Sequence, residues 1–383
     1  MAEGAFWLAW SQIKGIGPIL LLRLQRHFGT LAAAWHADAA ALGQVEGFGP
    51  KTVAAVLGAR KAIDPEKLAA AHLKDNPHFW TPADDDYPRL LREIPNPPAV
   101  LYYRGVVRPE ENQGMTPAVA IVGTREPTDY GKRWTRRISR LLSQKGFTIV
   151  SGMAQGIDSE AHRGCLEAGG RTIAVLGTGV DMVYPPRNQQ LYEQILQQGL
   201  VVSEYPAGTQ PDRAHFPQRN RIIVGLCRAV LIVEAPVNSG ALISARLAND
   251  FGRDVYVLPG RLDDRKSQGC LGLLSKGAQL IISEGYLLEM LGAIPQLDPA
   301  PVSTKEQKAE QLELFAPAPS TASVPDLAPD LAKVLEAVPS EAILFDLIVS
   351  EAAMEASSVS SALLQLELLG LVSQLPGMRY QRS

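Results

Sequence analysis

The stretch IVSGMAQGIDSEAHRGCLEAGGRTIAVLGTG, residues 149–179, decides the fold because it reads as strand, helix and strand. Its first and last segments are apolar runs without alternation, which is the pattern of strands buried on both faces. The segment between them, residues 158–170, has the composition of a helix and ends in glycines. This order of elements predicts a βαβ unit of a parallel sheet.

The same alternation continues on both sides of this stretch. Further apolar runs lie at residues 119–123, 200–205, 229–235, 254–260 and 278–283. Helix-like segments lie at residues 131–146, 187–199 and 240–252. Continuous strands separated by helices predict an α/β domain with a Rossmann-like, doubly wound parallel sheet that helices cover on both faces.

Composition shifts predict four parts: a helical domain at 1–73, an extended Rossmann-like domain at 74–292, a flexible linker at 293–329 and a winged-helix domain at 330–383. The Pro-rich start of the second part contains AVLYYRG, residues 99–105, which we expect to add an edge strand. The linker is rich in Pro, Ala, Ser and Gln and lacks apolar periodicity.

The helical start contains two similar units, IKGIGPILLLRLQRHFG (13–29) and VEGFGPKTVAAVLGARK (45–61). Each places Gly-apolar-Gly-Pro ahead of an amphipathic run, which predicts a pair of helix-hairpin-helix motifs. Such hairpins can present backbone N–H groups to a DNA phosphate, with Lys14, Arg23, Lys51 and Arg60 nearby. A small bundle that uses the hairpins only for packing is an equal alternative.

The C-terminal segment predicts a helix-turn-helix followed by a β-wing with Pro376-Gly377 at its tip. The expected recognition helix, residues 359–369, has no Lys or Arg and carries Glu367. Base reading requires cations or amides, so protein contact or packing is favoured here. Arg379 and Arg382 are the remaining argument for DNA.

Bulk properties exclude several classes of protein. The net charge of -3 is not that of a globally basic nucleic-acid binder, so any positive charge must be local. Cys165, Cys227 and Cys270 form no CxxC pair, which argues against disulfides and zinc and favours packed thiols. The N-terminus has no signal-peptide pattern, and no apolar run could span a bilayer. We therefore expect a cytoplasmic protein with no metal, cofactor or membrane partner.

Glycine and arginine follow the predicted strands at the edge where ligands of such sheets bind. Bare glycine amides and guanidinium groups together suit phosphate. We expect Arg219, Asn220 and Arg221 at the N-terminus of a helix IIVGLC, with Arg125 and Arg187 at the same edge. In the alternative, which can coexist, Arg219 and Arg221 pair with Glu204 or Glu234.

Other chemistries fit the sequence less well. A dinucleotide site requires GxGxxG after the first strand, where the chain has VGTREP, and a Walker A motif is absent. There is no GxSxG nucleophile elbow. Asp158 and His162 could form a dyad, but a helix cap with a hydrogen-bonded histidine is favoured.

Five motifs of the chain are long and ordered: VAIVGTREPTDYG, IVSGMAQGIDSEAHRGCLEAGG, YPPRN, HFPQRNRIIVGL and VLIVEAPVNSGALISARLANDFG. In these motifs the sequence resembles the DNA-processing protein A (DprA, or Smf) family. The similarity covers nearly the whole chain, with a SAM-like helical start and a winged-helix end. Here SQGCLGLL places Leu271 where the family usually has Asn, so one polar contact expected near the pocket is lost. The resemblance carries over these DNA-binding positions: Gly123, Thr124, Arg125, Ser151, Gly152, Gly156, Arg219, Asn220 and Arg221, with Arg187 for the basic position near Tyr184-Pro185.

The resemblance implies a non-enzymatic protein that binds single-stranded DNA, protects it after uptake in natural transformation and loads the RecA recombinase. It also implies a homodimer formed through the Rossmann-like domain. Tyr184, Tyr205 and Phe216 are candidate base-stacking residues, although a core or rim role is equally consistent with the sequence. The alternative function is a nucleotide phosphoribohydrolase of the lysine-decarboxylase-like type, but PVNSGALISA lacks its PGGxGTxxE motif.

Overall fold

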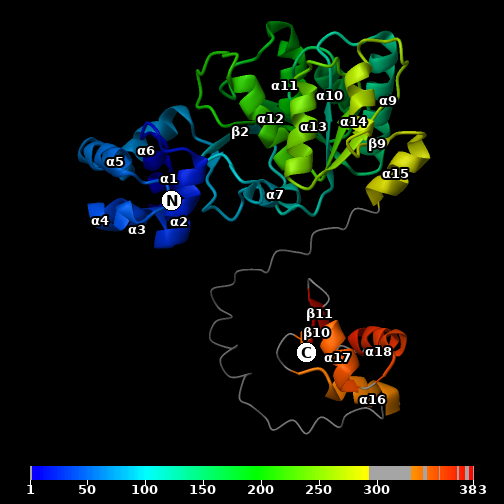
Figure 1. Cartoon of the computed structure of the whole chain (residues 1–383). Coiled ribbons are helices and arrows are strands. Elements are labelled where there is room, and N and C mark those ends of the chain that lie inside the picture. The colour runs from blue at the N-terminus through cyan, green and yellow to red at the C-terminus, as the bar shows by residue number, and fades with distance from the viewer. Residues whose placement is uncertain are drawn as a thin grey trace. The chain divides into compact units, whose positions relative to one another are not determined.

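A nine-stranded sheet organises the larger part of the computed structural model (Figure 1). The strand order is β1-β2-β6-β5-β4-β3-β7-β8-β9, and β3 to β9 are parallel. The strands are β1 (Phe79–Trp80), β2 (Leu101–Gly105), β3 (Ala118–Val122), β4 (Thr148–Ser151), β5 (Thr172–Leu176), β6 (Leu200–Ser203), β7 (Ala229–Ile232), β8 (Asp254–Val257) and β9 (Gln279–Leu280). The chain leaves β3 in one direction through β4 to β6 and resumes on its other side at β7, which confirms the doubly wound prediction.

The structure describes residues 2–292, 329–339, 343–352, 354–368, 371–375 and 379–382. They belong to two compact units, Met1–Pro301 and Val302–Ser383. The part of the linker at 293–328 and the wing tip at Pro376-Gly377 lie outside the described residues. In the described part of the chain, no helix has the length and apolar character needed to cross a membrane.

Helices cover both faces of the sheet, and the alternation of side chains in the strands separates the two cores. In β3, Ala118, Ala120 and Val122 join the cluster under one layer of helices, while Val119 and Ile121 join the opposite cluster. The first layer contains α12 (His215–Gly225), α13 (Ala241–Asp250) and α14 (Gln268–Leu274). The second contains α9 (Asp129–Gln144), α10 (Ile157–Glu167), α11 (Gln189–Gln198) and α15 (Glu284–Gly292).

Two antiparallel strands extend the sheet beyond β6. The predicted extra strand is β2, which pairs with β6, while the outermost strand β1 has only two residues and was not expected. Two short helices, α7 (Arg89–Arg92) and α8 (Pro109–Asn112), flank β2 along the chain. The strand is anchored to the body by Arg171, whose guanidinium pairs with Glu111 at 2.8 Å and bonds the carbonyl oxygen of Val106.

The helical start consists of α1 (Ala2–Ser11), α2 (Pro18–Phe28), α3 (Leu31–His36), α4 (Ala39–Gly43), α5 (Pro50–Ala62) and α6 (Pro65–Asp75). The two repeated units have the same turn: Gly15 and Gly47 both have a φ of 90°, and Pro18 and Pro50 both open a helix. Leu8 of α1 is buried in the cluster that covers α11. The helices therefore pack on the sheet domain, and the boundary after residue 73 stays a prediction.

Two of the four basic residues expected near the hairpins bond to other residues of this region. Arg60 donates to the carbonyl oxygens of Ala34 and Ala37 at 2.5 and 2.7 Å. Arg23 forms an ion pair with Glu46 at 3.1 Å. Lys14 and Lys51 are exposed.

The smaller unit has the predicted winged-helix topology. It contains α16 (Pro329–Glu336), β10 (Ile343–Leu344), α17 (Phe345–Ala352), α18 (Ala356–Leu368), β11 (Val372–Leu375) and β12 (Arg379–Arg382), and its sheet has the order β10-β12-β11. Helix α18 buries Val359, Leu363 and Leu366 and contains no Lys or Arg. Its composition therefore continues to favour packing or protein contact over base reading.

Candidate nucleic-acid interface

A pocket of about 70 Å³ lies at the carboxyl ends of β3, β4 and β5. This is the edge of a parallel sheet at which ligands bind. The loop after β3 supplies Arg125, the loop after β4 supplies Gly152 and Gln155, and α12 supplies Phe216 and Arg219. The remaining lining residues are Ala154, Leu176, Gly177, Thr178, Tyr184 and Pro185. The space suits a phosphate-sized group rather than a whole nucleotide, since small-molecule sites usually exceed ~300 Å³.

Arg219 places a buried positive charge at the floor of this pocket. This residue is 4% exposed, and its side chain forms no ion pair with a described residue. Nη1 donates to the carbonyl oxygens of Gly152, at 2.5 Å, and Val175. Burial lowers the pKa of the guanidinium, which is opposed by the nearby Asp158 carboxylate. Because arginine nevertheless stays protonated, an anion entering the pocket would meet a cation with little competing solvent.

Arg125 and aromatic rings form the mouth of the pocket. The Arg125 side chain is exposed, and its guanidinium lies 5.6 Å from the centre of the Phe216 ring. The rings of Tyr184 and Phe216 are 5.5 Å apart and tilted by 32°. Tyr205 does not line the pocket; it stacks on His215 at 3.9 Å. Flat rings beside two cations suit bases next to phosphate.

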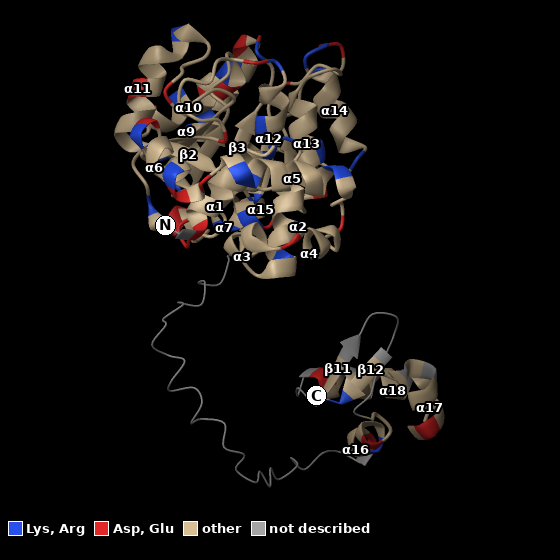
Figure 2. Ribbon diagram, turned by 90° about the vertical axis from the view of Figure 1, so that its left-hand side faces the viewer, with Lys and Arg blue, Asp and Glu red and all other residues tan. Residues whose placement is uncertain are grey.

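A wider depression of about 330 Å³ adjoins the pocket and shares Arg125 and Gln155 with it. It also contains Arg187 and Gly156, two of the predicted positions, together with Lys132 and Arg163. Its other lining residues are Glu126, Pro127, Ser159, Glu160 and Asn188. Figure 2 shows basic and acidic residues interspersed over the larger unit, in keeping with the net charge of -3.

The predicted glycines serve packing, and Gly152 does not offer the bare amide that we expected. Its N–H donates to the Asp158 carboxylate at 3.2 Å. A Cβ on Gly123 would lie 2.6 Å from Ile157. Gly156 has a φ of 91°, and a Cβ there would lie 2.3 Å from the carbonyl oxygen of Thr124. Glycine at these positions lets the loops after β3 and β4 approach each other, and the positive charge of the pocket comes from arginine.

Three more predicted residues support the loops and line neither the pocket nor the depression. Ser151 is fully buried, and its hydroxyl donates to the carbonyl oxygen of Ile121 at 2.6 Å. The Thr124 hydroxyl accepts from the backbone N–H of Glu126 at 3.2 Å. Asn220 is half-buried beside Gly240 at the start of α13, where its amide donates to the carbonyl oxygen at 3.4 Å.

The expected position of Arg219, Asn220 and Arg221 at a helix N-terminus was wrong. Helix α12 begins at His215, so these residues lie one turn inside it. Pro217 falls in the first turn, where a missing N–H costs no intrahelical bond. Residues two apart on a helix point about 200° from each other. Arg219 therefore enters the pocket while Arg221 turns away to Glu204, 2.7 Å distant, as the alternative interpretation proposed for this residue.

Asp158 and His162 form no dyad. The Thr172 hydroxyl donates to the carbonyl oxygen of Ile149, so it accepts from Nδ1 of His162 at 2.7 Å. Burial, with help from the Arg219 charge, lowers the pKa of His162 to about 3. Asp158 holds the Gly152 loop and makes no side-chain cap of its helix, and burial raises its pKa.

Glu234 occupies the place where a dinucleotide fold would hold phosphate. Its carboxylate accepts from the Thr128 N–H at 2.9 Å and from the Thr128 hydroxyl, at the start of the helix that follows the first parallel strand. The N-terminus of that helix is the usual pyrophosphate site. A carboxylate of the chain itself fills it, which gives a structural reason for the poor match to a dinucleotide motif. Glu234 pairs with neither Arg219 nor Arg221.

The three cysteines are buried and free, as the interpretation of packed thiols predicted. Burial raises the pKa of the Cys165 thiol to about 11 and that of Cys270 to about 12. Among the described residues, no group of three His, Cys, Asp or Glu side chains is placed to hold a metal ion.

Comparison with known proteins decides the family. Residues 78–292 match the model described as DNA recombination-mediator protein A, and residues 317–378 match the DprA winged helix domain. The chain belongs to the DNA recombination-mediator protein A family. The family match covers the strands and loops that form the pocket.

Relatives in this family include Protein Smf of Synechocystis sp., 52% identical over 401 residues, with 100% of this chain and 99% of the relative covered. A crystal structure of DNA processing protein A from Streptococcus pneumoniae is 34% identical, with a TM-score of 0.66 over 74% of this chain and 97% of that one. A Helicobacter pylori DNA processing protein A, whose structure concerns its single-stranded DNA binding mode, is 34% identical, with a TM-score of 0.50 over 56% of this chain and 95% of that one.

Sequence reasoning missed several residues that line the candidate site. Gln155 lines both the pocket and the depression, and Lys132 and Arg163 enter the depression from helices α9 and α10. Helical periodicity could have indicated that Lys132 and Arg163 lie near the sheet edge, but only the packing of α9 on α10 brings them together. Leu271 lies in α14 and lines neither space, so the departure from the family pattern does not reach them.

Proposed function

We propose that the pocket binds the phosphate backbone of single-stranded DNA through Arg125 and Arg219, while bases stack on Tyr184 and Phe216 at its mouth. The convergence of an exposed and a buried arginine on one phosphate-sized space carries this proposal. Guanidinium groups bind phosphate with charge-assisted hydrogen bonds. Aromatic faces accept any base, so an unpaired strand fits better than a duplex, whose bases are already stacked.

The biological role that we propose is DNA processing in natural transformation. The names of the Streptococcus pneumoniae and Bacillus subtilis relatives, DNA processing protein DprA, support this role. In this proposal the chain acts in the cytoplasm as a homodimer, protects incoming single strands and loads the RecA recombinase without catalytic turnover. Loading is measured as the rate of RecA filament formation on an oligonucleotide with and without the protein, and no acceleration would contradict this part.

The DNA site is tested with Arg125→Ala and with Arg246→Ala as the matched control. Arg246 is exposed on α13 and lines neither space, so both variants lose one surface charge. We expect Arg125→Ala to weaken binding of an oligothymidine about tenfold and to reduce the salt slope by about 0.7. Arg246→Ala should bind as the parent protein does. If both variants keep the parental affinity and slope, the site is wrong.

A nucleotide phosphoribohydrolase would behave differently. Incubation of the protein with nucleoside monophosphates should release no free base, and release above the level of a boiled control would contradict the binding-only proposal.

A further inference from the structure

A groove of about 450 Å³ runs between α10 and α11 beside the depression. Helix α10 contributes Arg163, Leu166 and Glu167 to it. Arg187 precedes α11, and the helix itself supplies mostly amides: Gln190, Leu191, Gln194, Gln197 and Gln198. Nothing in the proposed DNA site uses this groove.

The groove, the depression and the pocket adjoin one another, since neighbouring members share lining residues, and together they are called the trough. The groove and the depression share Arg163 and Arg187. The depression and the pocket share Arg125 and Gln155. A polymer held at Arg219 and leaving by the depression would therefore meet the groove next.

The glutamines form a stripe on one side of α11. Gln190, Gln194 and Gln197 are spaced by four and three residues, which places them on one helical face. All three are exposed, and their side-chain amides bond to no other described residue. By contrast, Gln189 of the same helix bonds to Glu193 at 2.9 Å. The amides of the stripe are free to bind a ligand.

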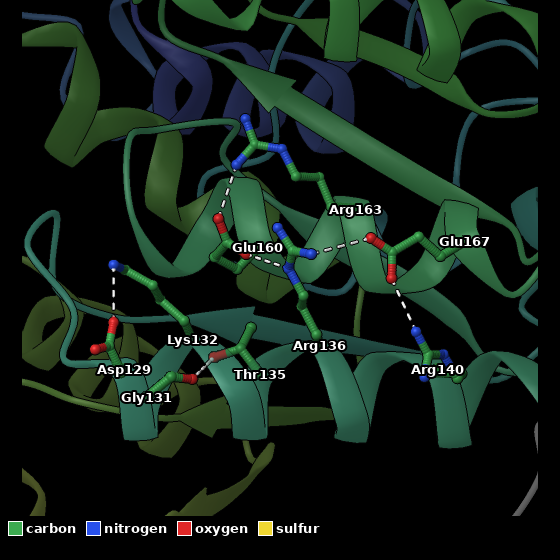
Figure 3. Close-up of polar contacts among 9 residues, drawn as sticks. All are labelled: Asp129, Gly131, Lys132, Thr135, Arg136, Arg140, Glu160, Arg163 and Glu167. Atoms are coloured by element: carbon green, nitrogen blue, oxygen red, sulfur yellow. Dashed lines mark hydrogen bonds and ion pairs between the residues drawn. The ribbon is translucent and has the colours of Figure 1, made fainter.

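Two of the three acidic residues that line the trough, Glu160 and Glu167, are paired with arginines, while the third, Glu126, forms no ion pair with a described residue. Figure 3 shows that Arg136 of α9 bonds both Glu160 and Glu167 of α10. Arg140 bonds Glu167 at 2.9 Å, and Arg163 bonds Glu160 at 2.8 Å. These ion pairs reduce the repulsion that Glu160 and Glu167 would exert on an anionic polymer. In the groove, such a polymer would contact the uncharged glutamine amides and Arg187, which forms no ion pair with a described residue.

We propose that this groove is a second subsite for the same DNA strand, in which the glutamine amides hold unpaired bases and backbone oxygens. This inference rests on the proposed function. A glutamine amide has donors and an acceptor, so it can bond a phosphate oxygen or the edge of any unpaired base. Unlike an arginine, it releases no counterion, so its contribution to affinity does not change with salt.

The length of the oligonucleotide separates the two subsites. An oligothymidine of about 5 nucleotides fills the pocket and depression, and one of about 15 also reaches the groove. In the triple variant Gln190→Ala/Gln194→Ala/Gln197→Ala, we expect affinity for the long strand to fall about tenfold with an unchanged salt slope, and affinity for the short strand to stay the same. Gln113→Ala is the control, because Gln113 is exposed near the opposite edge of the sheet, where Glu111 bonds Thr148 at the start of β4.

Arg125→Ala distinguishes failure of the groove from failure of the DNA site. It should weaken the binding of both strands. If it does so while the triple variant binds the long strand as the parent does, the groove inference is overturned and the DNA site stands. If Arg125→Ala weakens neither strand, the proposed function fails, and the groove inference fails with it.

Cross-linking locates the strand without relying on affinity. The three native cysteines are buried, so Gln194→Cys introduces an accessible thiol. A long oligothymidine with a thiol-reactive group near one end should cross-link to this variant, and to Gln113→Cys only at background. Equal yields from the two variants would overturn the proposal.

Discussion

Arg219 lies directly against the backbone of Gly152: a Cβ built on that glycine would be 2.1 Å from the arginine Nη1. The carbonyl oxygen of Gly152 also accepts from the same atom at 2.5 Å. The position of the buried charge therefore depends on the absence of a side chain at residue 152. The glycine makes room for the guanidinium, and its carbonyl holds it.

Gly152→Ala should displace this guanidinium from the pocket floor. The loss of a charge-assisted contact to DNA is worth roughly 2 kcal/mol, so we expect affinity for single-stranded DNA to fall at least about tenfold. The control is Gly58→Ala in α5, where a Cβ would have nothing within 4 Å. That variant should keep its affinity and gain up to about 1 kcal/mol of stability. Parental binding by Gly152→Ala would show that Arg219 makes no contact with the strand.

We predict that Arg221 contributes to the free energy of unfolding and not to the affinity for DNA. Its side chain is 9% exposed and pairs with Glu204, which is 17% exposed. Removing one partner of such a pair leaves the other charge buried without a partner. Arg221→Met should therefore lower the free energy of unfolding by about 3 kcal/mol, as measured in a urea titration. The folded variant should bind DNA like the parent protein, since Arg221 lines neither the pocket nor the depression.

A second substitution checks the cause. Combining Arg221→Met with Glu204→Leu should recover much of the lost stability, because no buried charge is then left unpaired. A double variant that is less stable than Arg221→Met alone would contradict the ion-pair explanation.

Much of the fold could be predicted because its signal is local. Continuous apolar runs such as residues 229–232 can be buried only where helices cover both faces, and the structure has this arrangement. The role of each arginine was less accessible. It depends on where α12 begins, and Pro217 in its first turn concealed that start. Because each helical residue is rotated by about 100°, the two-residue spacing of Arg219 and Arg221 directs one to the pocket and the other to Glu204.

The glycines misled for a different reason. A glycine that admits a ligand and a glycine that admits another part of the protein look the same in a sequence. At Gly156 the approaching group is the carbonyl oxygen of Thr124, and at Gly152 it is Arg219. Such contacts join residues far apart in the chain, so only the three-dimensional arrangement identifies them.

His162 is predicted to make the protein sensitive to acid. Its pKa is about 3 in the folded protein, against about 6.5 when unfolded, so the unfolded chain takes up a proton first as the pH falls. Stability should therefore decrease from about pH 6.5 downward, by roughly 3 kcal/mol at pH 4 from this residue alone. In His162→Gln, the difference in unfolding free energy between pH 7 and pH 4 should be smaller by about this amount. An unchanged difference would mean that His162 becomes protonated in the folded state.

Glu234 is predicted to substitute for an anion at the start of α9. Glu234→Ala removes the acceptor for the N–H and hydroxyl of Thr128, which should lower the free energy of unfolding by about 2 kcal/mol. Glu234→Gln retains a carbonyl oxygen and should lose about half as much. Because the vacated helix N-terminus favours anions, inorganic phosphate should raise the melting temperature of the alanine variant more than that of the parent protein or of Glu234→Gln. Equal shifts for all three proteins would show that the carboxylate is not occupying an anion site.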